Sequence, residues 1–241
     1  MDEMTRCVDS VLRARRTTRA FGPAPVSAEQ VHEILEIASC APSNSNTQPW
    51  RVHVLAGAPM RELGHALVAA FQRGDVPPAA HFPDPLPQAV ALRQEDFGAR
   101  YYAALGIDRA DMQGRARQTQ RNFSFFGAPV GLVFSIDRRL NAHSWLDLGL
   151  FLQNVMIAAK ARGIDTCAQV AFARFHSVIA RHLAMPEADV TVCGMSMGYA
   201  DAAASVNRMQ VPRERVQDFA RFVGFDAEVG CRGQQAPRGT L

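Results

Sequence analysis

The stretch that decides the fold runs from Trp145 to Phe172 and reads WLDLGLFLQNVMIAAKARGIDTCAQVAF. Residues 144–162 are almost entirely apolar and long enough for about five helical turns, and Gly163 ends the pattern. A helix that is apolar all round is predicted to be buried on most sides. A short strand over residues 165–170 is predicted to follow the glycine.

Outward from this stretch, helices and strands alternate along the chain. Helices are predicted at 4–14, at 28–38 with Ser27 as the cap, and at 58–73, 89–105, 109–124, 174–184 and 213–222. Further strands are predicted at 50–55, 129–136 and 190–197. Helices around a small sheet indicate an α+β fold. We expect one domain over 1–241, with a helical excursion at about 74–124 that begins in a proline-rich loop (74–88) and a tail from about 225.

The composition excludes several classes of protein. Of the 241 residues 48% are hydrophobic and the net charge is only +3, so the chain is not disordered. It has no apolar run of the length that a membrane span needs, and acidic residues near its start argue against a signal peptide, so we expect a cytoplasmic protein. The basic residues are arginines except Lys160, without the clustering that a nucleic-acid surface requires.

The cysteines and histidines predict neither a disulfide framework nor a metal site. Five cysteines stand at 7, 40, 167, 193 and 231, an odd number without CxxC spacing. Cys40, Cys167 and Cys193 lie in apolar stretches, which predicts reduced, buried thiols. His176 and His182 are six residues apart, which is not a metal-ligand spacing.

Residues 194–198 read GMSMG and match the G-x-S-x-G pattern of a hydrolase nucleophile. The segment follows a predicted strand, as that motif requires. In α/β-hydrolases the catalytic histidine comes after the serine, yet no histidine follows His182 in this chain. A serine hydrolase that uses Ser196 is therefore only a distant alternative.

Two polar segments are better candidates for a binding site. Residues 13–21, RARRTTRAF, combine arginines with two hydroxyl side chains, a set that suits phosphate oxygens. Residues 41–50, APSNSNTQPW, place six small polar side chains between two prolines, in a loop whose amides suit the edge of a heterocycle. A solvated basic turn and a plain surface loop are the alternatives. Neither GxGxxG nor the P-loop pattern occurs.

Together with FFGAPVGLVF, VTVCGMSMGYAD and NRMQVPRERVQDFARF, these segments resemble, in this order, the FMN-dependent nitroreductase family. The likeness is greatest to the bacterial nitrobenzene and nitrobenzoate nitroreductases. It implies a nitroreductase-like fold, with a small and mostly antiparallel central sheet wrapped by helices, in an intertwined homodimer. It also explains the GMSMG segment as an ordinary central strand.

The resemblance further implies which residues bind FMN. Arg15, Arg16 and Thr17 would hold the phosphate and ribityl chain, and Arg19 would approach the pyrimidine edge of the flavin. The partner subunit would contribute Pro42, Ser43, Asn44 and Asn46. The strand end at Gln169, Val170 and Ala171 would face flavin N5 and O4 with its backbone. Arg213 would grip the phosphate near the C-terminus, with Arg208 as the alternative.

The activity that the resemblance implies is reduction of nitroaromatics to hydroxylaminoaromatics by NAD(P)H. Hydride transfer through FMN N5 would follow ping-pong kinetics, with no catalytic side chain and no metal. Candidate substrate contacts are Tyr101, Tyr102, Arg121, Phe123 and Phe126, for each of which ordinary core packing is the alternative. Reduction of quinones or activated alkenes, reductive dehalogenation, and flavin binding without turnover are the other possibilities. Dehalogenation of the halotyrosine type is disfavoured because the one lysine, Lys160, lies in the predicted buried helix.

Overall fold

The computed structural model describes residues 2–75 and 85–225. The chain divides into two units, Met1–Met209 and Gln210–Leu241. The described part of the first unit contains four strands: β1 (Arg51–Ala56), β2 (Val130–Asp137), β3 (Asp165–Gln169) and β4 (Asp189–Gly198). Its α-helices are α1 (Glu3–Ala14), α2 (Ala28–Ala38), α3 (Gly57–Arg73), α4 (Gln88–Leu105), α5 (Met112–Phe123), α6 (Ala142–Ala161), α7 (His176–His182) and α8 (Ser205–Arg208). Three short 3-10 helices, η1 (Asn44–Asn46), η2 (Phe125–Gly127) and η3 (Val170–Phe175), join them.

The four strands form one sheet in the order β1-β2-β4-β3, and every neighbouring pair is antiparallel. Val133 of β2 lies opposite His53 of β1 on one side and Gly194 of β4 on the other. All eight residues of β2 are buried, as expected of a central strand that is covered on both faces. The predicted α+β fold with a small antiparallel sheet is confirmed.

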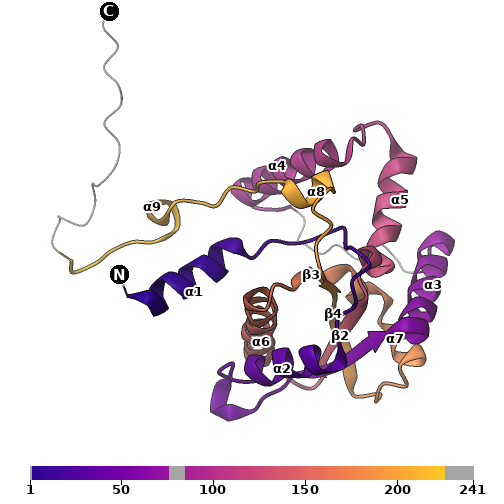
Figure 1. The fold of residues 1–241 in the computed structure, drawn as a ribbon, viewed down its shortest axis with the longest axis horizontal. Helices are drawn as coiled ribbons and strands as arrows, with labels where there is room; N and C mark the ends of the chain where they lie inside the picture. The colour runs from indigo at the N-terminus through magenta and orange to yellow at the C-terminus, as the bar shows by residue number, and fades with distance from the viewer. Residues whose placement is uncertain (1, 76–84, 226–241) are drawn as a thin grey trace, which may run out of the picture. The chain divides into compact units, whose positions relative to one another are not determined.

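Each face of the sheet has its own hydrophobic core, because side chains alternate along a strand. Leu132, Phe134 and Ile136 pack with α2 and α6 on one face. Val133 lies on the other face, with the apolar sides of α3 and α7 and the phenylalanines around α5. Figure 1 shows the strands between α2 and α6 on one side and α3 and α7 on the other.

Gly194 of the GMSMG segment and Gly131 of β2 make room for aromatic rings. A Cβ atom on Gly194 would lie 2.7 Å from the ring of Phe172, and one on Gly131 would lie 2.4 Å from the ring of Phe125. Both distances are far shorter than a normal contact. Glycine therefore allows two phenylalanines of the second core to lie directly on the central strands.

Helix α6 corrects one sequence prediction. It buries a single side, which includes Leu148, Phe151 and Val155, rather than most of its surface. Leu146 remains 64% exposed and Trp145 44% exposed. Packing within this chain therefore explains the apolar residues on only one side of the helix.

Four further predictions differ from the structure. The helix expected at 213–222 is limited to α9 (Val216–Phe219) in the second unit. The strand expected at 165–170 ends at Gln169, and the helix expected at 174–184 is a 3-10 segment followed by seven residues of α7. Cys40 is exposed rather than buried, because it lies beyond the end of α2, whereas Cys167 and Cys193 are buried as predicted.

Part of the predicted proline-rich loop (76–84) and of the tail (226–241) lies outside the described residues. Within 2–75 and 85–225, no helix combines the length and apolar character that a membrane crossing requires. The single-domain prediction stays a prediction.

Candidate active site

A cavity of about 250 Å³ lies at the end of β3, between that strand and the helices of the excursion. Polar, aromatic and aliphatic side chains share its wall. They are Arg19, Phe97, Tyr101, Tyr102, Gln118, Thr119, Asn122, Phe126, Cys167, Ala168, Gln169 and Val170. Segments far apart in the sequence therefore meet at the edge of the sheet, which is a common position for a ligand pocket.

Arg19 is held at the cavity by its backbone. The preceding residue, Thr18, donates a backbone hydrogen bond of 3.0 Å to the carbonyl of Thr166 in β3. The amide of Arg19 donates to Oδ1 of Asn207 at 2.9 Å. Its guanidinium carbon lies 5.3 Å from the ring centre of Phe97 and 5.0 Å from that of Tyr101, both on α4. These cation–π contacts aim a positive charge into the cavity.

A chain of buried hydrogen bonds fixes the strand end. The hydroxyl of Ser196 donates to Oε1 of Gln169 at 2.8 Å. Nε2 of Gln169 donates to the carbonyl of Asn122 at 2.5 Å and to its Oδ1 at 2.9 Å. The side-chain amide of Gln169 thus has hydrogen-bond partners on both β4 and α5. These bonds hold the following backbone at the cavity, where Val170 is 59% exposed.

The same bonds exclude Ser196 as a hydrolase nucleophile. Ser196 is fully buried, and its acceptor is an amide rather than a histidine. His176 makes its hydrogen bond with Thr191 instead, at 3.1 Å. A serine nucleophile needs an exposed hydroxyl and an adjacent base, and this one has neither.

Arg19 is the single charged side chain among the described lining residues. The hydroxyl of Tyr101 accepts a hydrogen bond of 2.8 Å from Gln118, and burial raises the pKa of this phenol. Burial also raises the pKa of the Cys167 thiol to about 11, against the opposing effect of Arg19. Both groups are therefore neutral near pH 7. No cluster of three His, Cys, Asp or Glu side chains in residues 2–75 and 85–225 is arranged to hold a metal.

The polar loop after α2 adopts a strained backbone. Ser45, Asn46 and Gln48 have φ angles of 51°, 56° and 46°, in the left-handed region. The amide of Asn44 donates to Oδ2 of the buried Asp147 in α6 at 3.2 Å. Such strain persists where the surroundings fix it, and it is typical of binding loops.

The predicted loop contacts lie outside the cavity of their own chain. Pro42, Asn44 and Asn46 are exposed and Ser43 is half-buried, and none of the four lines the cavity. The loop is anchored at its far end, where Trp50 stacks on Phe151 with ring centres 4.7 Å apart. The exposed amide side chains of the loop therefore lie outside the cavity, while its end at Trp50 is held by packing.

The predicted phosphate-binding residues follow α1, which ends at Ala14. Arg15 and Thr17 are half-buried and Arg16 is exposed, and Thr17 forms a β-bridge with Thr166.

The two C-terminal candidates lie in different units. Arg208 belongs to α8 in the first unit, and its Nη1 donates to the carbonyls of Ala202 and Ala203. Arg213 belongs to the second unit and donates to the carbonyls of Val211 and Pro212. Which of the two binds phosphate stays a prediction.

The structure separates the predicted substrate contacts. Tyr101, Tyr102 and Phe126 line the cavity. Phe123 instead packs in the second core, with its ring centre 4.7 Å from that of Phe175, and Arg121 is exposed and does not line the cavity. Ala171 also packs against the second core rather than lining the cavity.

Several lining residues escaped the sequence analysis. They are Phe97, Gln118, Thr119, Asn122, Cys167 and Ala168. A periodic signal was present for three of them: Phe97 lies four residues before the predicted Tyr101, and Gln118 lies four residues before Asn122, so that each pair shares a helix face.

Known proteins resemble this chain over most of its length. The Nitroreductase family profile matches residues 12–199. The chain is 49% identical to a 4-nitrobenzoate reductase of Pseudomonas putida, over 92% of this chain and 98% of the relative. It is 42% identical to a nitrobenzene nitroreductase of Ectopseudomonas oleovorans, over 90% and 96%.

A solved structure agrees. The FMN-dependent nitroreductase NfnB from Mycobacterium smegmatis, crystallised in complex with NADPH, superposes with a TM-score of 0.87 at 33% identity, covering 92% of this chain and all of that one. The sheet order, the cavity at the end of β3 and these matches lead to one conclusion: the chain belongs to the nitroreductase family.

Proposed function

We propose that this protein is an FMN-dependent NAD(P)H nitroreductase that reduces nitroaromatics of the nitrobenzene and nitrobenzoate kind to hydroxylaminoaromatics. One observation carries the proposal: the 250 Å³ cavity in which Arg19 faces the end of β3 among aromatic side chains. Relatives named for nitrobenzoate and nitrobenzene reduction support it.

The residues present fit FMN. A flavin mononucleotide needs cations for its phosphate and both donors and acceptors for its ring edge. Arg15, Arg16 and Thr17 would hold the phosphate and ribityl chain, with Arg213 or Arg208. Arg19 would meet the pyrimidine edge, and the backbone from Gln169 to Ala171 would lie along the reactive edge.

The chain's own contribution is position and charge. FMN supplies, when bound, two-electron hydride transfer from NAD(P)H to the nitro group. Arg19 would place a positive charge beside the ring edge, which gains negative charge on reduction. Tyr101, Tyr102 and Phe126 offer flat apolar surface for a planar substrate and exclude water from it. Shared use of one cavity by donor and substrate would give ping-pong kinetics.

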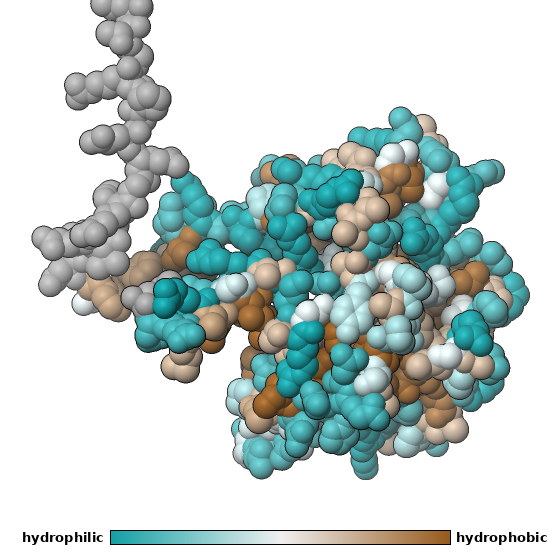
Figure 2. Space-filling model, viewed as in Figure 1, coloured by the Kyte–Doolittle hydropathy of each residue, from teal (hydrophilic) through white to brown (hydrophobic). Residues whose placement is uncertain are grey.

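The exposed apolar side chains support a homodimer. Met4, Val8 and Leu12 form an exposed stripe on α1, which buries none of its residues within the chain. On α6, Trp145, Leu146 and Leu150 are exposed as well. Figure 2 shows hydrophobic surface between hydrophilic regions of the visible face. Large side chains of this kind are typical of obligate interfaces, and a partner seated there would bring Pro42, Ser43, Asn44 and Asn46 to the flavin.

The cytoplasm is the expected location, because an enzyme that consumes NAD(P)H depends on the pool of that cofactor. The exposed thiols of Cys7 and Cys40 agree with a reducing compartment.

Product analysis tests the activity. Protein loaded with FMN is given NADPH and nitrobenzene in air, and the products are separated by chromatography. We expect hydroxylaminobenzene with two NADPH consumed per nitro group, and no suppression by oxygen, because electrons move in pairs. If nitrobenzene is untouched while a quinone or an activated alkene is reduced, the substrate class is wrong and the flavin assignment stands.

A further inference from the structure

A second and larger cavity, of about 770 Å³, lies along α4 and the segment that leads into α5. It is lined by Leu92, Glu95, Tyr102, Ile107, Arg109 and Arg115, among others. Tyr102 lines this cavity and the candidate active site alike. The two cavities are therefore neighbours at this side chain.

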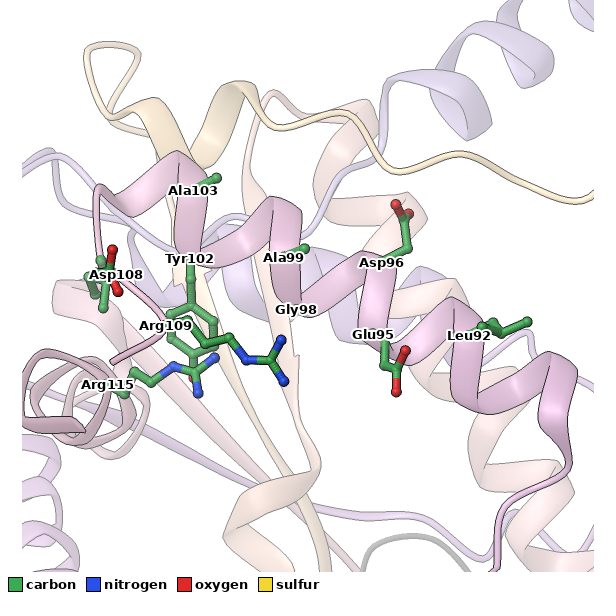
Figure 3. Close-up of a pocket in the computed structure, with 11 residues that line it drawn as sticks. Leu92, Glu95, Asp96, Gly98, Ala99, Tyr102, Ala103, Asp108, Arg109 and Arg115 are labelled. Carbon is green, nitrogen blue, oxygen red and sulfur yellow. The ribbon is translucent and has the colours of Figure 1, made fainter. Parts of the chain in front are cut away.

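Two guanidinium groups converge on this cavity. The Arg115 guanidinium carbon lies 4.1 Å from the ring centre of Tyr102, and its buried Nε has no hydrogen-bond partner among the described residues. Figure 3 shows Arg109 and Arg115 on the side of α4 to which Tyr102 points, with the Arg109 guanidinium between Tyr102 and Glu95 in this view. A buried donor without an acceptor is unfavourable, and an anionic ligand would supply the acceptor.

Three acidic residues, Glu95, Asp96 and Asp108, also line the cavity, and two of them have hydrogen-bond donors. The Asp96 carboxylate accepts a hydrogen bond of 2.7 Å from Arg100, and in Figure 3 it points away from the side of α4 to which Tyr102 points. Asp108 accepts from the amide of Ala110 at 2.9 Å. Glu95 remains on the cavity side, at the end away from Arg115. The two guanidinium groups thus outnumber the one carboxylate, Asp108, that lies at the Arg115 end in Figure 3, and Glu95 marks the other end.

We propose that this cavity binds the adenosine 2′-phosphate end of NADPH and makes NADPH the preferred donor. Arg109 and Arg115 would pair with the 2′-phosphate, since guanidinium forks match phosphate oxygens and an arginine distinguishes NADP from NAD. Glu95 would accept hydrogen bonds from ribose or adenine. The inference rests on the proposed function, because it requires a nicotinamide donor at the neighbouring cavity.

The size of the cavity favours a nucleotide over a nitrobenzoate carboxylate. Its volume of about 770 Å³ is about three times that of the candidate active site, which measures about 250 Å³. The lining residues of α4 run from Leu92 to Ala103, a length of about 16 Å at 1.5 Å per residue. A single aromatic ring is far shorter than this.

The test compares Arg109→Gln, Arg115→Lys and the Arg109→Gln/Arg115→Gln double variant with the unchanged protein. Arg117→Gln is the matched control, because Arg117 lies on the same helix as Arg115 but does not line the cavity. We expect the ratio of kcat/KM for NADPH to that for NADH to fall at least tenfold in the double variant, through KM for NADPH. Calorimetry with 2′,5′-ADP gives a readout without turnover, and its Kd is expected to rise by a similar factor.

An unchanged donor ratio together with unchanged binding of 2′,5′-ADP would overturn the inference. So would a rise in KM for 4-nitrobenzoate without one for NADPH, which would assign the cavity to the substrate carboxylate. Arg109→Gln alone decides the matter if the Arg115 variants fail to fold, since Arg109 is exposed. Failure of the proposed function is a separate result: no nitroarene reduced with either donor, while 2′,5′-ADP still binds through the arginines.

Discussion

The hydroxyl of Ser196, in the central strand β4, donates a 2.8 Å hydrogen bond to the side chain of Gln169, the last residue of β3. The serine of a hydrolase-like motif is thereby a buried support for the strand end at the candidate flavin site. Gln169 passes the connection on to Asn122 of α5. One side-chain amide thus ties β4 to two elements of the cavity wall, β3 and α5.

Ser196→Ala is expected to lower the free energy of unfolding by about 1–3 kcal/mol, because it leaves a buried amide oxygen without its donor. Chemical denaturation measures the change. Ser124→Ala is the control, since Ser124 is exposed and its loss should cost under about 0.5 kcal/mol. A fluorophosphonate should label neither protein, and rapid labelling at Ser196 would restore the hydrolase interpretation.

Arg19→Ala is expected to lower the midpoint potential of bound FMN, because the reduced ring loses a neighbouring cation. A charge-assisted hydrogen bond of about 1.5–3 kcal/mol corresponds to roughly 30–60 mV for a two-electron couple. Equilibration with a redox dye measures the shift. Arg19→Lys keeps the charge and should recover most of it. Equal potentials in Arg19→Ala and the unchanged protein would remove Arg19 from this role.

The cysteines should separate by reactivity. Burial raises the pKa of Cys167 to about 11 and that of Cys193 to about 12. At pH 8 only about one in a thousand Cys167 side chains would be the reactive thiolate, a fraction that rises tenfold with each pH unit. Iodoacetamide followed by peptide mass spectrometry should therefore modify Cys7 and Cys40 first. Equal labelling of Cys167 and Cys7 at pH 8 would contradict the buried environment of Cys167.

Leu146→Glu should weaken the proposed dimer, because it places a charge in the exposed apolar face of α6. Sedimentation should show a dimer for the unchanged protein and a substantial monomer fraction for the variant. The fraction of protein that retains FMN should fall as the dimer dissociates, since the loop with Pro42, Ser43, Asn44 and Asn46 would complete the site from the other subunit. Met112→Glu is the control, an exposed apolar residue at the start of α5. A monomeric unchanged protein that retains FMN would refute the shared site.

The sequence predicted the elements whose signals are local. The apolar run of β2 and the length of α6 placed both within two residues of their observed bounds. The capping box at Ser27, in which Ser27 and Gln30 exchange hydrogen bonds, marked the start of α2. These features depend on neighbouring residues and are readable without tertiary structure.

The features that the sequence did not predict depend on tertiary contacts. The hydrogen bond between Ser196 and Gln169 joins residues 27 positions apart, and neither side chain signals the other. Phe123 and Phe126 are three positions apart, yet only Phe126 reaches the cavity, because left-handed residues at 125 and 126 turn the chain between them. The short helix α9 belongs to the second unit, where helical propensity alone did not extend the helix to 213–222.

The most direct test of the proposed activity is the visible absorption spectrum of the purified protein during stepwise addition of NADPH and then nitrobenzene, without air. The account predicts a yellow protein whose flavin band bleaches with NADPH and returns with nitrobenzene, which demonstrates both half-reactions. A protein that bleaches but does not recover with any nitroarene would contradict the substrate assignment. A colourless protein that cannot be loaded with FMN would contradict the central claim.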